Sequence, residues 1–236
     1  MDSVPYDFKN SVICLISLCS LKDLELLGGK SWSSIAETHK NQNCEVFLML
    51  FNNGTSFGYN HNHQPYYELI PENLTKLKRI NCIQLISLDL TLQFPNKGFI
   101  APTDQQLRFG EWWMSRNPPR TLSLASRLET LEDKFSFLWK QKVETIFVSP
   151  SCRNTEILNF QLFENENLKL VAIKSSNDEE CQTFAKTLME GWVKGERIEA
   201  WSSDVDLDSA LLDMKREWWK DVKNEASGKK LTFGFL

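Results

Sequence analysis

The residue types that most often carry chemistry are sparse in this chain. Gly28-Gly29-Lys30-Ser31 resembles the end of a phosphate-binding loop, but the full motif needs a glycine where Leu24 stands, and a strand before it. His61-Asn62-His63 supplies two imidazoles, which do not complete a metal site, and His39 is the only other histidine. No G-x-S-x-G or family-type cysteine motif pairs His39 with a nucleophile. An enzyme would need a deep polar pocket of titratable groups, so we expect no enzyme, cofactor or metal.

Tryptophan pairs are a stronger signal, and they point to protein contacts. Adjacent tryptophans on one helix point about 100° apart, so both rarely face the same core. Trp218 and Trp219 are predicted on a helix, so one of them lies between two repeats or faces a partner, whereas Trp112 and Trp113 lie in a proline-containing connection. Tryptophan is common among interface hot spots. The alternative is that all of them are packing residues. The residues predicted to contact a target protein are Trp112, Trp113, Trp201 and Trp218.

Composition narrows the class of protein further. The chain has 236 residues and a net charge of −4, from 27 basic and 31 acidic side chains, whereas nucleic-acid surfaces are usually basic. Six cysteines are scattered without a C-x-x-C pair, which is typical of free thiols in a reducing compartment. No apolar run is long enough to span a bilayer, and the first residues lack the features of a signal peptide. We therefore expect a cytoplasmic or nuclear protein with no nucleic-acid or membrane partner.

The elements that must position these residues begin with a predicted hairpin. Residues 45–51 form an apolar strand, Asn52-Asn53-Gly54 is a turn signal, and residues 55–59 return as a second strand. Residues 82–92 read as a further strand. The proline-containing stretch 93–120 is predicted to be a long irregular connection, a kind of segment that often carries function.

From residue 120 onward, helices and strands alternate. Helices are predicted around 128–138, 156–163, 176–192 and 208–222, and strands at 143–148, 168–173, 197–201 and 230–235. The strand starts are 25, 29 and 33 residues apart, and 20–29 residues is usual for leucine-rich repeats. The predicted fold class is therefore α/β, with a leucine-rich-repeat-like β-α arc over residues 44–236. An ordinary α/β sheet is the alternative.

Residues 4–43 have the pattern of three short helices. Pro5 suits the first turn of a helix, and Phe8, Val12 and Ile16 recur at helical spacing. A second cluster around Leu24 and Leu27 ends at Gly28-Gly29, since glycine accepts the left-handed conformation that closes many helices. Trp32, Ile35 and Ala36 then line the inner side of a third helix. So small a unit buries little surface, which leaves apolar residues for a partner.

This segment resembles an F-box, the three-helix module that docks onto Skp1 in cullin-based ubiquitin ligases. Val4-Pro5 stands where the family has Leu-Pro, and Asp7 matches its acidic position. The resemblance divides the chain into an F-box-like module, 1–43, and a target-binding domain, 44–236. The alternative is an N-terminal helical cap without Skp1 contact. The Skp1-binding residues that the resemblance implies are Val4, Pro5, Phe8, Val12, Ile16, Leu24, Leu27 and Trp32.

An F-box followed by divergent β-α repeats is similar to the large nematode-type F-box families. The resemblance implies an adaptor that binds Skp1, and through it a cullin ligase, and that recruits one specific protein for ubiquitination and degradation. An antidote that removes a toxic protein is one form that such an adaptor takes. The alternative function is a ligase-independent inhibitor or scaffold with a decayed F-box.

Overall fold

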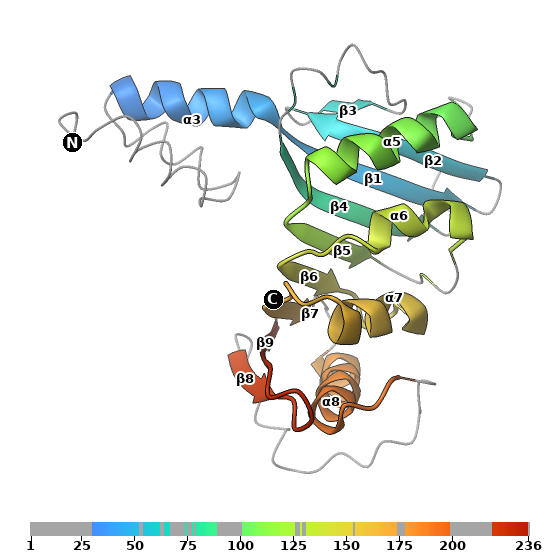
Figure 1. Ribbon diagram of the computed structural model, residues 1–236, viewed down its shortest axis with the longest axis vertical. Coiled ribbons are helices and arrows are strands. Elements are labelled where there is room, and N and C mark those ends of the chain that lie inside the picture. The colour runs from blue at the N-terminus through green and yellow to red at the C-terminus, as the bar shows by residue number, and fades with distance from the viewer. Residues whose placement is uncertain are drawn as a thin grey trace.

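The computed structural model describes residues 30–51, 54–61, 64–66, 74, 77, 79–88, 101–125, 128, 131–152, 154–173, 178–198 and 219–235 (Figure 1). These residues form a mixed α/β fold, as predicted, around one sheet. Residues 1–29, which hold the first two predicted helices, lie outside the described part of the chain.

The helices and strands alternate over most of the chain. The helices are α3 (Lys30–Gln42), α5 (Asp104–Arg116), α6 (Ser136–Trp139), α7 (Thr155–Asn159) and α8 (Asp178–Lys194), with a 3₁₀ turn η1 (Asp133–Phe135) and a π turn η2 (Phe160–Glu164). The strands are β1 (Asn43–Phe51), β2 (Gly54–His61), β3 (Gln64–Tyr66), β4 (Arg79–Leu88), β5 (Thr121–Ala125), β6 (Thr145–Val148), β7 (Leu170–Ile173), β8 (Trp219–Lys223) and β9 (Lys230–Phe235).

The strand order is β3-β2-β1-β4-β5-β6-β7-β9-β8. Strands β1, β4, β5, β6, β7 and β9 run parallel, and each follows its neighbour in chain order without a reversal. Antiparallel partners flank this series, with β2 and β3 at one edge and β8 at the other. Strands β5, β6 and β7 start 24 and 25 residues apart, so their connections have the length of one short repeat.

The two faces of the sheet differ in what covers them. Helices α5, α6, α7 and α8 all lie on one side of the sheet (Figure 1). The strands present a continuous apolar row to that side, and every member is fully buried. This row is Val46, Ile83, Leu122, Ile146, Val171 and Phe233. The core of the described chain therefore lies between the sheet and these helices.

Several predicted elements are confirmed. The hairpin of β1 and β2 pairs Phe51 with Gly54 across the expected turn. The predicted strands at 143–148, 168–173 and 230–235 correspond to β6, β7 and β9, and the helices near 156–163 and 176–192 correspond to α7 with η2 and to α8. Helix α3 matches the third helix predicted for the F-box-like segment.

The stretch 93–120 was wrongly predicted as irregular, since it contains α5. A capping box starts this helix: Thr103 accepts a hydrogen bond from the Gln106 amide, and the Gln106 side chain accepts one from the Thr103 amide. Strand β5 follows Pro119 after one residue and was not predicted.

Three more predictions, all for residues after 120, are wrong. The helix predicted at 128–138 is reduced to η1 and α6. Residues 219–222, predicted as the end of a helix, belong to β8, because pairing with β9 satisfies their backbone. Arg197 and Ile198 are not in a strand, and residues 199–201 lie outside the described residues.

Candidate functional site

The predicted Skp1-binding residues fall almost wholly outside the described chain. Val4, Pro5, Phe8, Val12, Ile16, Leu24 and Leu27 are not among the described residues. Trp32 is described, on the first turn of α3, with a side chain that is 8% exposed. Its predicted role stays a prediction, and the structure adds that the indole is buried in the free chain.

Helix α3 buries one face, as the sequence predicts. Trp32, Ile35 and Ala36 recur at helical spacing and are all buried. The helix extends away from the sheet and ends where β1 begins, with Gln42 followed directly by Asn43 (Figure 1). No connecting residue separates the predicted F-box-like module from the first strand.

The tryptophan pair on α5 divides between core and solvent. Trp113 is 4% exposed and belongs to the core, whereas Trp112 is 50% exposed. Among the described residues, Trp112 is the one large hydrophobic side chain that is exposed. The sequence placed this pair in an irregular connection; the structure places it on a helix, where adjacent side chains point about 100° apart. Trp201 and Trp218 lie outside the described residues.

The exposed indole is held by its helical neighbours. The Phe109 ring, one turn earlier, lies 5.6 Å from it between centroids. The guanidinium of Arg116, one turn later, lies over the indole at 4.8 Å. Arg108 and Glu111 are exposed beside it. The indole is thus fixed in place while half of its surface remains in water, an arrangement suited to contact with another molecule.

The sheet face opposite the helices is a second candidate surface. Its residues alternate with those of the buried row. The first row on this face is Glu45, Cys82, Thr121, Thr145, Leu170 and Thr232, and the second is Phe47, Gln84, Ser123, Phe147, Ala172 and Gly234. We call these two rows the open face. Most of its side chains are half-buried, and the exceptions are Phe47, Ala172 and Gly234, which are buried.

Polar and apolar groups are mixed on the open face. Gln84 donates a hydrogen bond to the Glu45 carboxylate at 3.0 Å, and Thr232 donates one to Asp221 on β8 at 2.7 Å. Between these pairs lie hydroxyl groups and the ring of Phe147. The surface can therefore contact a protein through both hydrogen bonds and apolar area, and it holds no convergent set of titratable groups.

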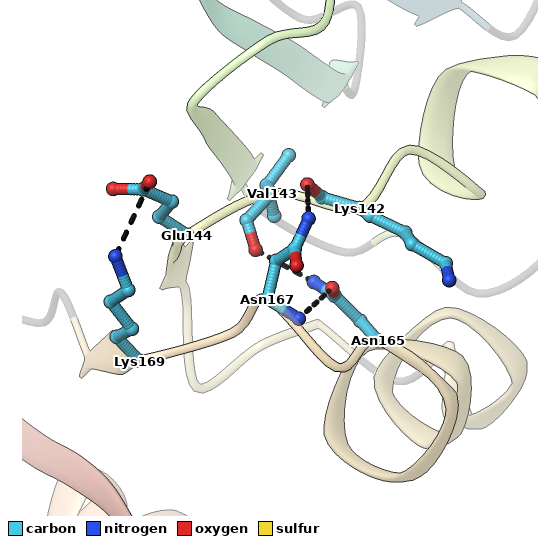
Figure 2. Close-up of polar contacts among 6 residues, drawn as sticks. All are labelled: Lys142, Val143, Glu144, Asn165, Asn167 and Lys169. Atoms are coloured by element: carbon cyan, nitrogen blue, oxygen red, sulfur yellow. Dashed lines mark hydrogen bonds and ion pairs between the residues drawn. The ribbon is translucent and has the colours of Figure 1, made fainter.

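Side-chain amides connect successive β-α units. The Asn165 side chain donates to the Val143 carbonyl at 2.7 Å, and Asn167 donates to the Lys142 carbonyl at 3.4 Å (Figure 2). Gln161, fully buried, donates to the carbonyls of Trp139 and Gln141. We call Gln161 and Asn165, joined by a 2.7 Å hydrogen bond, the amide pair.

The amide pair is structural. Its donors satisfy the carbonyls of Trp139 and Val143 before β6, and they share the Gln141 carbonyl with the Val143 amide. Lys229, before β9, donates to the Asn165 carbonyl at 2.8 Å and lies over the Trp192 ring. Desolvation by burial lowers the pKa of Lys229, against the opposing charge of Glu166. The amide pair and Lys229 therefore connect the turn before β6 with the turn before β7 and the loop before β9.

The groups considered for chemistry do not converge in the described chain. The His61 ring hydrogen-bonds the Asn41 carbonyl at 3.0 Å, and Asn62 and His63 lie outside the described residues. Lys30 and Ser31 are in α3, so the described end of the phosphate-loop-like motif is helical. Within the described ranges, no three histidine, cysteine or acidic side chains form a group that could hold a metal ion.

Comparisons with protein-family models, curated proteins and solved structures found no match to this chain. None of the helices in the described part of the chain has the length and apolar character required to cross a membrane. The features that bear on function are therefore the two surfaces, Trp112 with its neighbours and the open face, and the sequence of residues 4–43.

Proposed function

We propose that this protein is an F-box adaptor, in which residues 4–43 bind Skp1 and residues 44–236 recruit one specific protein for ubiquitination. The adaptor acts by proximity, because it raises the concentration of the target's lysines near the ubiquitin carrier. It needs no cofactor of its own. The setting is cytoplasmic or nuclear.

The observation that most supports this proposal is the order of the parallel strands. Each parallel strand lies next to its predecessor, and α5 to α8 lie on one side of the sheet (Figure 1). Solenoid proteins built this way stack one unit on the next and use the sheet surface to bind partners. This order fits the leucine-rich-repeat-like arc expected for the second part of such an adaptor, and it supports the proposal that the open face captures the target.

The junction of α3 with β1 also fits an adaptor. A helix that runs into a strand without a linker holds the two parts at a fixed distance. Proximity works best when target and carrier are held in a defined geometry, so a rigid junction suits this role.

The test is co-purification with Skp1. We expect the wild-type chain to form a stoichiometric complex, and the double variant Pro5→Ala with Leu24→Asp to lose it. The matched control is Phe147→Glu on the open face, which leaves the F-box-like segment intact and should retain Skp1. Circular dichroism of each variant checks that the loss is not unfolding. A folded wild-type chain that does not bind Skp1 rules the proposal out.

One observation favours the alternative, a ligase-independent inhibitor or scaffold with a decayed F-box. Trp32, Ile35 and Ala36 are already buried in the free chain, so this face of α3 is not available to a partner. In that case the chain would neutralise its partner by binding alone. Trp32→Ala separates the two: loss of folding without Skp1 points to a structural cap, and loss of Skp1 binding in a folded chain points to the adaptor.

A further inference from the structure

Helix α5 carries a row of exposed side chains on its outer side. Arg108, Trp112 and Arg116 are spaced four residues apart, so they lie along one face of the helix, and all three are exposed. We call these three residues the α5 stripe. The opposite side of the helix packs into the core through Leu107, Trp113 and Met114.

The fold does not require a tryptophan at position 112. The core contacts of α5 come from its other side, and half of the Trp112 surface is in water. Each Å² of this exposed apolar surface that a partner buries would favour binding by roughly 25 cal/mol. The indole is also pre-ordered, because Phe109 and Arg116 contact it and reduce the rotamer freedom that binding would remove.

The charges beside the indole are available for pairing. Arg108, Glu111 and Arg116 form no ion pair with any described residue. The Arg116 guanidinium lies 4.8 Å from the centre of the ring, and its charge has no acidic partner among the described residues. A guanidinium on each side of an exposed indole is complementary to an apolar side chain flanked by carboxylates.

We propose that the α5 stripe is a protein-docking surface for an acidic segment that offers an apolar side chain to Trp112 and carboxylates to Arg108 and Arg116. This surface lies on the helix side of the sheet, away from the open face, so it goes beyond the proposed function. It does not depend on Skp1. Tryptophan and arginine are the residues most enriched among interface hot spots, and α5 has no lysine.

The composition of the stripe favours a protein over a membrane. The stripe has one exposed aromatic ring and two arginines, which is a narrow surface for insertion into a bilayer. Membrane-bound helices instead combine a wide apolar face with many basic residues.

The experiment selects ligands for the full chain from a random peptide library displayed on phage. We expect the selected peptides to carry an apolar residue with aspartate or glutamate on both sides. Synthetic copies should lose roughly 10- to 100-fold in affinity for Trp112→Ser, measured by fluorescence anisotropy. The double variant Arg108→Glu with Arg116→Glu should lose a similar factor, and a peptide with lysines in place of its acidic residues should recover binding to it.

Two controls keep this test separate from folding and from the Skp1 test. Phe147→Glu changes the open face and should leave peptide affinity unchanged, and Skp1 co-purification should be equal for wild type and Trp112→Ser. The proposal is overturned if no Trp112-dependent peptide is selected, or if the selected peptides are basic. It is also overturned if Trp112→Ser abolishes binding to vesicles of phosphatidylcholine and phosphatidylserine, or abolishes a dimer seen by sedimentation, since either result assigns the stripe to a different occupant.

Discussion

The same strands contribute to two different faces of the sheet. One face is buried under helices and stabilises the fold, and most side chains on the other are only half-buried. On β6, Ile146 and Val148 face the helices and are fully buried, whereas Thr145 and Phe147, which alternate with them, face the other side and are half-buried. Side chains alternate along a strand, so one short segment contributes to both faces. The buried row on the helix-covered face is wholly apolar, and the open face mixes hydroxyls, amides and single aromatic rings.

This difference indicates where sequence changes are tolerated. Every residue of the buried row contacts others in one core, so a change of volume is felt by its neighbours. A residue of the open face can change with little effect on that core. Such a division lets one scaffold keep its fold while the residues of the open face vary.

The largest expected change in the free energy of unfolding comes from a comparison of two phenylalanines, one on each face of the sheet. Phe233→Ala removes a fully buried ring and should lower the free energy of unfolding by about 3–5 kcal/mol. Phe147→Ala removes a half-buried ring from the open face and should lower it by less than about 1.5 kcal/mol. Urea unfolding monitored by circular dichroism gives both values. Equal losses would show that the open face is covered as fully as the helix side.

The next largest loss of stability is expected for the amide pair, whose hydrogen bonds connect neighbouring β-α units at one end of the strands. Gln161→Ala leaves the carbonyls of Trp139 and Gln141 without this donor, and it removes the acceptor of Asn165. Buried unsatisfied groups cost about 1–3 kcal/mol each, so we expect a loss of roughly 2–4 kcal/mol in unfolding free energy.

The control for this prediction is Asn167→Ala. Asn167 is exposed, and its side chain makes one long hydrogen bond to the Lys142 carbonyl, so we expect a loss below about 0.5 kcal/mol. If Gln161→Ala is as mild as this control, water replaces the lost donor, and the amide pair does not stabilise the turn.

Elements with strong local signals could be predicted from the sequence. The apolar run of β1 with its Asn-Gly turn, and the helical periodicity of α8, identify these elements without any tertiary information. Helix α5 was missed because prolines on both sides suggested an irregular segment, although Thr103 and Gln106 form a recognisable capping box. Strand β5 is short and weakly patterned, so its pairing with β4 and β6 decides its conformation.

Tertiary pairing also explains the error at the end of the chain. Residues 219–223 continue a helical pattern, yet they form β8 because β9 offers an unpaired edge. The candidate site was predictable only in part. Trp112 and Trp113 were singled out as target contacts, but their division between solvent and core, and the α5 stripe, could not be recognised before the helix itself was known.

The final prediction uses two cysteines to report on the two faces. Cys44 is buried in the core, and burial, with a smaller contribution from the Glu45 carboxylate, raises the pKa of its thiol from 9.0 to about 12. Cys82 lies on the open face and is half-buried. Because the thiolate is the reactive species, an alkylating reagent should modify Cys82 faster than Cys44 by at least roughly tenfold at neutral pH. Peptide mapping by mass spectrometry measures the two rates.

The raised pKa of Cys44 also predicts the direction of a pH effect. The folded chain keeps the thiol proton up to about pH 12, whereas the unfolded chain loses it above pH 9.0. The contribution of Cys44 to stability is therefore fully present below pH 9.0 and is lost as the pH rises toward 12. Replacing Cys44 with valine removes the titrating group, so the variant should lose less stability than wild type over this range. If the two proteins lose the same stability as the pH rises, water reaches Cys44, and the helix-covered face is accessible to solvent at β1.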